Sequence, residues 1–276
     1  MSLNMMLKNI NWKLVKYFEI ARLAYVNSGV YLANILGKSL TVVLRIWIFT
    51  QLYRVTFAVA GSDVVGGLTV VQVIWSLMLV QSFETSTRPM ISKLIDEEIK
   101  SGSFAYQVNK PYSYIFYHLA GYFGRVTANV GSNLLIGTVA AWFLVGAIDW
   151  SWPGLFFGLL ILILGYTLDF LISMSIGLVS FWWEDSNTIM WMYSKGRFLL
   201  GGVILPIALF PEKIQKIAEI LPFANLYYAP ARIMVNFDWN LAEKFVLVQL
   251  VWIFLSIMIV SIMYSRGVKN VAINGG

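Results

Sequence analysis

Long runs of apolar residues dominate the chain and predict membrane-spanning helices. A helix needs about 20 mostly apolar residues to cross the hydrocarbon core of a bilayer. Six segments approach this pattern: residues 30–53, 67–83, 127–148, 153–183, 188–210 and 245–264. The second, third and sixth hold no charge, and the fifth is apolar mainly after Arg197. The pattern therefore predicts an all-α polytopic membrane protein with six transmembrane helices in a single transmembrane domain over residues 1–276.

The composition agrees with this prediction and excludes several classes of protein. Hydrophobic residues make up 59% of the chain and charged residues 12%, about half the roughly 25% of soluble domains. This argues against a soluble enzyme or a nucleic-acid-binding module. There is no Cys and only one His, His118, so no disulfide, catalytic thiolate or His-based metal site is expected.

The basic residues between the apolar segments predict the orientation. Most of them fall on one side of a six-span arrangement: Lys8, Lys13, Lys16, Arg22, Arg88, Lys93, Lys100, Lys110, Lys195, Arg197, Arg266 and Lys269. By the positive-inside rule that side is cytoplasmic, so we expect a multi-pass protein of the cytoplasmic membrane with both termini in the cytoplasm. Residues 211–244 lie on the other side, and their own four basic residues weaken the asymmetry without reversing it.

The N-terminal segment, residues 1–28, is predicted to lie along the membrane surface. Leu14, Phe18, Ala21 and Tyr25 recur at helical spacing, and basic residues surround them. A helix of this kind suits the interface between lipid headgroups and acyl chains.

A second amphipathic helix is predicted within residues 88–111, on the cytoplasmic side. Its apolar stripe consists of Ile91, Leu94, Ile95 and Ile99, its polar face includes Lys93, Asp96, Glu97, Glu98 and Lys100, and Gly102 suits its end. The stripe must be buried against the membrane, the protein's own bundle or a partner protein, and the pattern does not distinguish these three environments.

A third segment, residues 211–244, is predicted to re-enter the membrane from the outside. Ile214, Ile217, Ile220 and Leu221 form a stripe between Pro211 and Pro222. This stretch is too short to span a bilayer, and a helix that dips into the outer leaflet fits it.

Charged residues within the apolar segments are candidates for a functional pair. Arg45 and Asp169 lie at similar estimated depth, and ionisable groups there usually face a partner or water. We therefore predict that they pair. Gly37-Lys38-Ser39 resembles the end of a phosphate-binding loop, but Leu32 stands where that loop needs Gly. The sequence thus shows no catalytic set and no nucleotide site of its own.

Several stretches resemble the ABC-2 type transporter permeases, and most closely the branch known as ABC-2 family transporter proteins. The run from Ile95 to Pro111 is similar to that family's acidic, Ile-x-Ser-Gly and Arg-Pro pattern, although Lys110 stands where the family usually has Arg. Leu221-Pro222-Phe223, the stretch from Tyr228 to Arg232 and the stretch from Ile20 to Tyr25 also fit. The Lys110 side chain keeps the charge but lacks the planar fork of Arg.

The resemblance implies a permease subunit of an exporter rather than an enzyme. It implies that the chain pairs with a second permease subunit and with ATP-binding cassette ATPase subunits, which bind ATP and Mg²⁺, so the chain itself needs no cofactor. It also implies that the segment of Ile91, Leu94, Ile95, Asp96, Glu97, Glu98, Ile99, Lys100 and Gly102 couples to the ATPase. The aromatic content favours an apolar or amphipathic substrate. Two alternatives remain open: a polytopic membrane enzyme, and a channel or assembly scaffold that uses no ATP.

Overall fold

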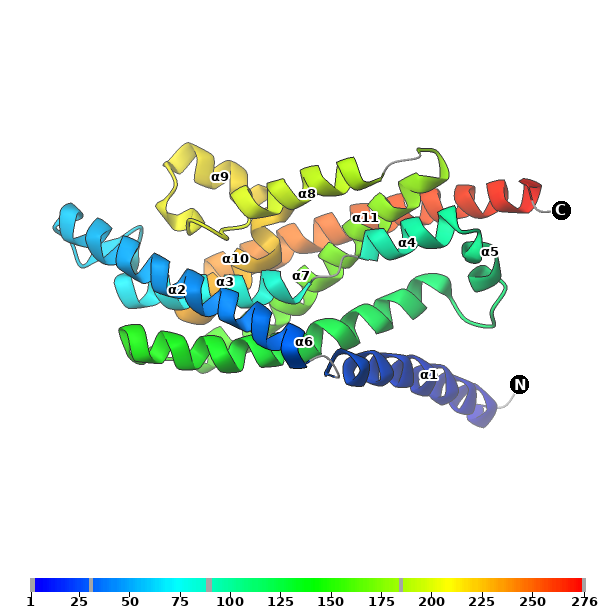
Figure 1. Cartoon of the computed structure of the whole chain (residues 1–276), viewed down its shortest axis with the longest axis horizontal. Coiled ribbons are helices and arrows are strands. Elements are labelled where there is room, and N and C mark those ends of the chain that lie inside the picture. Colours follow the sequence, from blue (N-terminus) through cyan, green and yellow to red (C-terminus); the bar gives the residue numbers. More distant parts are fainter. Residues whose placement is uncertain (1–2, 30–31, 88–90, 184–185, 275–276) are drawn as a thin grey trace.

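The computed structural model describes residues 3–29, 32–87, 91–183 and 186–274, which form an elongated bundle of helices (Figure 1). Four helices contain stretches long and apolar enough to cross a membrane. These stretches are Leu40–Ala60 in α2 (Leu32–Ala60), Tyr114–Val145 forming α6, Trp152–Phe181 in and after α7 (Trp152–Leu178), and Trp239–Lys269 in α11 (Trp239–Asn274). The predicted all-α membrane protein is confirmed to this extent.

The helix α3 (Val70–Ser86) lies at the centre of the bundle. The side chain of Thr69 accepts a hydrogen bond from Gln72, which bonds back to the backbone of Thr69, and this capping box starts the helix. Nearly every residue from Val73 to Ser86 is buried, because α2, α6 and the helix α10 (Pro222–Val235) surround it. With 17 residues, α3 is about 26 Å long at 1.5 Å per residue.

A tight hairpin precedes α3 and marks one end of the bundle. Its strands β1 (Val64–Val65) and β2 (Leu68–Thr69) pair antiparallel, with Val64 opposite Thr69. Gly66 and Gly67 make the turn with φ of +60° and +73°, which glycine adopts without steric cost. We call this end of the molecule the hairpin end.

The helices α7 and α10 approach each other closely. Gly154 and Gly165 face backbone carbonyl oxygens of α10, where a Cβ would lie 2.9 Å from the oxygen of Ile233 and 2.6 Å from that of Leu226. The absence of side chains at these positions brings the two backbones together. As a result α10 is buried almost throughout, although it begins only two residues after a surface helix, α9 (Glu212–Ile220).

The fifth predicted span is not one continuous helix. The helix α8 (Asn187–Leu200) has 14 residues and is about 21 Å long. It ends at Gly201, and Gly202 has a φ of +73°. The chain then reaches a short 3-10 helix, η2 (Ile207–Leu209). The predicted span over residues 188–210 is therefore helical in its first half only, because two consecutive glycines end α8.

The N-terminal helix α1 (Leu3–Gly29) lies along α6. Ala21 and Ala24 face Gly124, a small position that allows close approach. Tyr17 accepts a hydrogen bond from the backbone of Ser113, and Lys16 donates one to the carbonyl of Pro111. Leu14 and Phe18 are more than 60% exposed, so α1 keeps a free apolar side.

The short helices α4 (Ile91–Lys100) and α5 (Ser103–Val108) lie at the end opposite the hairpin (Figure 1). The N-terminal end of α1 and the C-terminal end of α11 lie at this same end, which we call the α4 end. Residues 88–90, the start of the predicted cytoplasmic segment, fall outside the described residues. Within the predicted segment 88–111 the structure has a helix over Ile91–Lys100, and Gly102 follows its end.

Candidate functional site

A fully buried ion pair lies in the middle of the bundle. Arg197 of α8 donates from Nη1 to Oδ1 of Asp169 on α7 at 2.8 Å, and both side chains are 2% exposed. The predicted pairing of Asp169 with Arg45 is wrong. Arg45 instead donates to Oε1 of Gln81 at 2.7 Å, because α2 packs beside α3.

Three tyrosines surround this pair. Tyr122 and Tyr193 each donate to the Asp169 carboxylate at 2.8 Å, one to each oxygen. Tyr227 accepts from Arg197 at 2.7 Å and lies 3.3 Å from Oδ1 of Asp169. Thr87, the C-cap of α3, lies 3.1 Å from the hydroxyl of Tyr227 and 3.3 Å from Arg197. We call this group the polar cluster: Asp169, Arg197, Tyr122, Tyr193, Tyr227 and Thr87.

The polar cluster joins side chains from five parts of the bundle. Its members come from α6, α7, α8, α10 and the end of α3. Both oxygens of Asp169 accept hydrogen bonds, and its charge is paired with Arg197. Removing one partner of such a pair strands the other charge and typically costs about 3–5 kcal/mol. The cluster therefore fixes the relative positions of five segments.

The helix α4 packs its apolar side against its own bundle. Ile91 and Ile95 are 1% and 0% exposed, and Ile95 lies so close to α7 that a Cβ on Gly177 would be 2.8 Å from its own Cβ. Of the three environments left open by the pattern, the protein interior is the one observed for these two residues. Leu94 is 38% exposed and points away from this contact.

Two acids of α4 are also bound within the molecule. Asp96 is 5% exposed and accepts from Lys100 and Ser186, each at 2.9 Å, and from Ser180. Burial raises the pKa of Asp96, but these hydrogen bonds outweigh it and hold the pKa below its ordinary value. The carboxylate is therefore the form that the fold stabilises.

Glu98 is held in a similar way by α6. It accepts from the hydroxyl of Tyr114 at 2.6 Å and lies 3.3 Å from Nε2 of the buried His118. Burial raises the pKa of Glu98, whereas the contacts with His118 and Tyr114 lower it further than burial raises it. Asp96 and Glu98 therefore fasten α4 to the bundle, and His118 has a defined partner.

The exposed side of α4 holds fewer charged residues than the sequence predicts, because Asp96 and Glu98 face the bundle. Lys93 and Glu97 form a loose pair at 3.9 Å, and their side chains are 70% and 65% exposed. Gly102 lies between α4 and α5 and has a φ of +74°. A hollow of about 480 Å³ opens next to α4 and η1 (Val179–Phe181), lined by Ile99, Lys100, Ser180, Phe181, Trp182 and Trp183.

The predicted external segment, residues 211–244, contains α9, α10 and the start of α11. Pro211 precedes α9, and Pro222 begins α10. Ile214 and Ile217 are 47% and 61% exposed, so the stripe faces away from the protein. The α9 segment follows η2, which packs against the hairpin at Gly66, and this places it toward the hairpin end.

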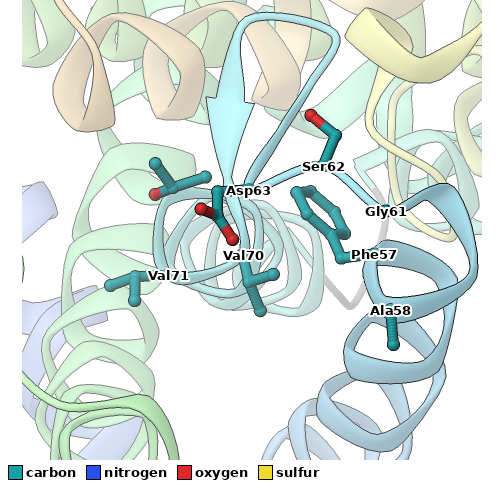
Figure 2. Close-up of a pocket in the computed structure, with 8 residues that line it drawn as sticks. Phe57, Ala58, Gly61, Ser62, Asp63, Val70 and Val71 are labelled. Carbon is teal, nitrogen blue, oxygen red and sulfur yellow. The ribbon is translucent and has the colours of Figure 1, made fainter.

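A second hollow opens at the hairpin end and is shown in Figure 2. It has a volume of about 430 Å³ and lies between the end of α2 and the start of α3. Phe57, Val70 and Val71 give it an apolar lining, and Asp63 is the charged residue that lines it. A single exposed carboxylate over an apolar wall offers no acid and base pair for chemistry.

The residues that the structure describes include no group of three His, Asp or Glu side chains that could bind a metal ion. Five of the six members of the polar cluster were not predicted from the sequence: Arg197, Tyr122, Tyr193, Tyr227 and Thr87. A usable signal was present, because Tyr193 and Arg197 are four residues apart and so share one face of a helix. Gln81 was a second such signal, because a polar residue within an apolar span needs a partner, and here that partner is Arg45.

Comparison with known proteins identifies the family. No curated protein matches the chain. A family model described as ABC-2 family transporter protein matches residues 45–275. This match covers most of the chain, including α4, the polar cluster and the long apolar helices, and membrane proteins of this family typically have no nucleotide-binding domain of their own. The chain belongs to the family of ABC-2 transporter membrane proteins.

Proposed function

We propose that the chain is the membrane-spanning permease subunit of an ATP-binding cassette exporter. A separate ATPase subunit binds ATP and Mg²⁺ and powers it, and a second permease subunit completes the transport path. The exported substrate is apolar or amphipathic, in keeping with the 16% of aromatic residues in the chain. The family membership and the absence of a phosphate-binding loop from the sequence support this proposal.

In this proposal the six spans are α2, α3, α6, α7, α8 and α11. The α4 end faces the cytoplasm, α1 packs along α6 in that half of the bundle and turns its apolar side to lipid, and α9 and α10 re-enter from the outside. The support is the charge distribution, since Lys16, Arg22, Lys93, Lys100 and Arg266 belong to the segments gathered at the α4 end. The shorter helices α3 and α8 lie against other helices within the bundle.

One observation carries the proposal: α4 is fixed rigidly to the bundle and still presents a charged outer side. Ile91 and Ile95 lock it against α7, while Lys93, Leu94 and Glu97 remain accessible. When a soluble partner displaces such a surface, the helices behind it move too, because the packed core does not deform freely. The adjacent hollow with Trp182 and Trp183 extends the surface available to the ATPase.

Transport then follows from different affinities of two conformations. ATP binding in the partner favours one arrangement of the ATPase subunits, and the substrate favours one arrangement of the two permeases. Coupling requires that these preferences be linked through a shared two-state element. The docked α4 and the helices fixed to it serve as that element.

The test is co-purification of an ATPase subunit with the tagged chain from its native membrane. Glu97→Lys reverses an exposed charge on α4, and we expect it to lower the amount of bound ATPase about tenfold. The matched control is Glu212→Lys on α9, also an exposed acid, and it should leave the amount unchanged. Loss of binding in both variants, or in neither, contradicts docking on α4.

A further inference from the structure

The helix α8 is attached to the bundle by few buried groups. Of its 14 residues, all of which the structure describes, three are buried: Met190, Tyr193 and Arg197. Two of these belong to the polar cluster. The opposite side exposes Trp191, Met192 and Leu199, each more than 60% exposed. On its buried side Met190 packs in the apolar core and Gly196 lies against the ring of Phe223. A helix with so narrow a buried side is an element that can shift as a unit.

The first attachment point of α8 is on α4. Oδ1 of Asp96 accepts a hydrogen bond from Ser186, the residue that precedes α8, at 2.9 Å. The same oxygen accepts from Ser180 in η1. Ser180 and Ser186 stand on either side of the connection from α7 to α8, so one buried carboxylate of α4 holds both ends of that connection.

The second attachment point is the polar cluster. Arg197 reaches Asp169 of α7 at 2.8 Å and Tyr227 of α10 at 2.7 Å. It also contacts Thr87, the cap of the helix that precedes α4 in the chain, at 3.3 Å. The beginning of α8 is therefore tied to α4, and its last turn is tied to the centre of the bundle.

We propose that Asp96 is the positioning residue that makes α8 follow α4 when the ATPase acts. The inference rests on the proposed function in taking α4 as the surface that the ATPase displaces. Asp96 suits this role because its carboxylate is buried and its other oxygen is held by Lys100 of the same helix. A displaced α4 pulls Ser186 with it, and α8 turns about its anchor at Arg197. Within the described part of the chain, the neighbouring Glu97 pairs with Lys93 and is not part of this link.

The test measures distances between spin labels in the complex of the chain with its ATPase, with and without ATP. The chain has no native Cys, so labels go only where Cys is introduced. Met192→Cys reports on α8, Tyr106→Cys on α5, which packs against α4, reports on α4, and Phe143→Cys on α6 is the common reference. All three positions are exposed. We expect ATP to change both the α4 and the α8 distances to the reference.

Three substitutions, two at Asp96 and one on α9, then separate the link from general stability. Asp96→Ala should abolish the change at α8 while the change at α4 remains. Asp96→Asn keeps an oxygen that accepts from both serines, so it should restore the change at α8. Glu212→Ala on α9, an exposed acid outside the docking surface, is the matched control and should leave both changes intact. If Asp96→Ala does not fold, the double variant Ser180→Ala and Ser186→Ala keeps the carboxylate and its contact with Lys100 and should also abolish the change at α8.

The outcomes distinguish this inference from the proposed function. A change at α8 that persists in folded Asp96→Ala or in the double serine variant overturns the role of Asp96. So does a wild-type complex in which α4 moves with ATP and α8 does not. If neither label responds to ATP, or no ATPase binds the chain, the proposed function fails and this inference fails with it.

Discussion

The helices α4 and α9 have nearly the same sequence pattern and opposite surroundings. Each is a short helix with isoleucines along one side and charges along the other. In α4 the isoleucines point inward, and Ile91 and Ile95 are almost fully buried. In α9 they point outward, and Ile214, Ile217 and Ile220 are 47–61% exposed. An amphipathic pattern therefore predicts a helix with two faces but not which face meets the protein.

Each of the two helices also buries one acid. Glu219 of α9 is 6% exposed and accepts from Lys244 at 2.5 Å and from Gln215 at 3.0 Å. The helix α9 thus turns a charged residue toward the protein and its isoleucines away from it. This arrangement suits a helix whose outer side meets lipid. The helix α4 buries Asp96 together with its isoleucines and so leaves a mainly charged side for water or a soluble partner.

The largest expected difference between the two helices lies in their isoleucines. Ile95→Ala opens a cavity against Gly177 and should lower the free energy of unfolding by about 2–5 kcal/mol. Ile217→Ala removes an exposed side chain and should change it by about 0.5 kcal/mol or less. Denaturant titration of the purified chain in one detergent measures both. Equal losses would mean that α4 is not packed as described.

A smaller decrease in the free energy of unfolding is expected when a methyl group is added between α4 and α7. In Gly177→Ala the new Cβ would lie 2.8 Å from Cβ of Ile95 and 2.9 Å from the carbonyl oxygen of Ser92, and overpacking of this kind costs about 1–3 kcal/mol. Gly131→Ala on α6 is the matched control, because nothing lies within 4 Å of its Cβ. The same titration should show Gly177→Ala as the less stable variant. A neutral Gly177→Ala would contradict the close contact.

Acid should loosen α4 through Asp96. Because the fold holds its pKa below the ordinary 3.8, the Asp96 carboxylate stabilises the folded state above that pH, and this contribution is lost as the pH falls through the folded pKa. Glu98 acts in the same direction. Hydrogen exchange measured from about pH 6 to about pH 3 should show protection of α4 falling, and Asp96→Asn should reduce the pH dependence. Protection of α4 that rises as the pH falls would contradict a lowered pKa of Asp96 in the folded state.

The smallest effects are expected for the exposed ion pairs of the two helices. Lys93 and Glu97 on α4 and Glu212 and Lys216 on α9 are all at least 65% exposed. Pairs of this kind contribute about 0–1 kcal/mol, so Glu97→Ala and Glu212→Ala should each change stability by less than about 1 kcal/mol. This comparison matters for the docking experiment, because it separates loss of a partner from loss of the fold. A strongly destabilised Glu97→Ala would remove that separation.

Local features of the fold were predictable from the sequence, whereas contacts between helices were not. The helix within residues 88–111, the helical stripe after Pro211 and four of the long apolar helices follow from hydrophobic periodicity and from Gly and Pro positions. The partner of Asp169 did not follow, because sequence gives the depth of a charge but not which helix stands beside it or how that helix is rotated. Arg45 and Arg197 were both available near that depth, and only the packing of α8 against α7 selects Arg197. The environment of the α4 stripe was left open for the same reason.

The most direct test of the central claim, that α4 meets a separate ATPase, is site-specific photo-crosslinking in the native membrane. A photoreactive amino acid replaces Glu97 on α4 in one strain and Lys216 on α9 in another, since both side chains are more than 60% exposed. The account predicts a crosslink to a soluble protein with a phosphate-binding loop from position 97 and none from position 216. No such crosslink from position 97, or an equal one from position 216, would contradict it.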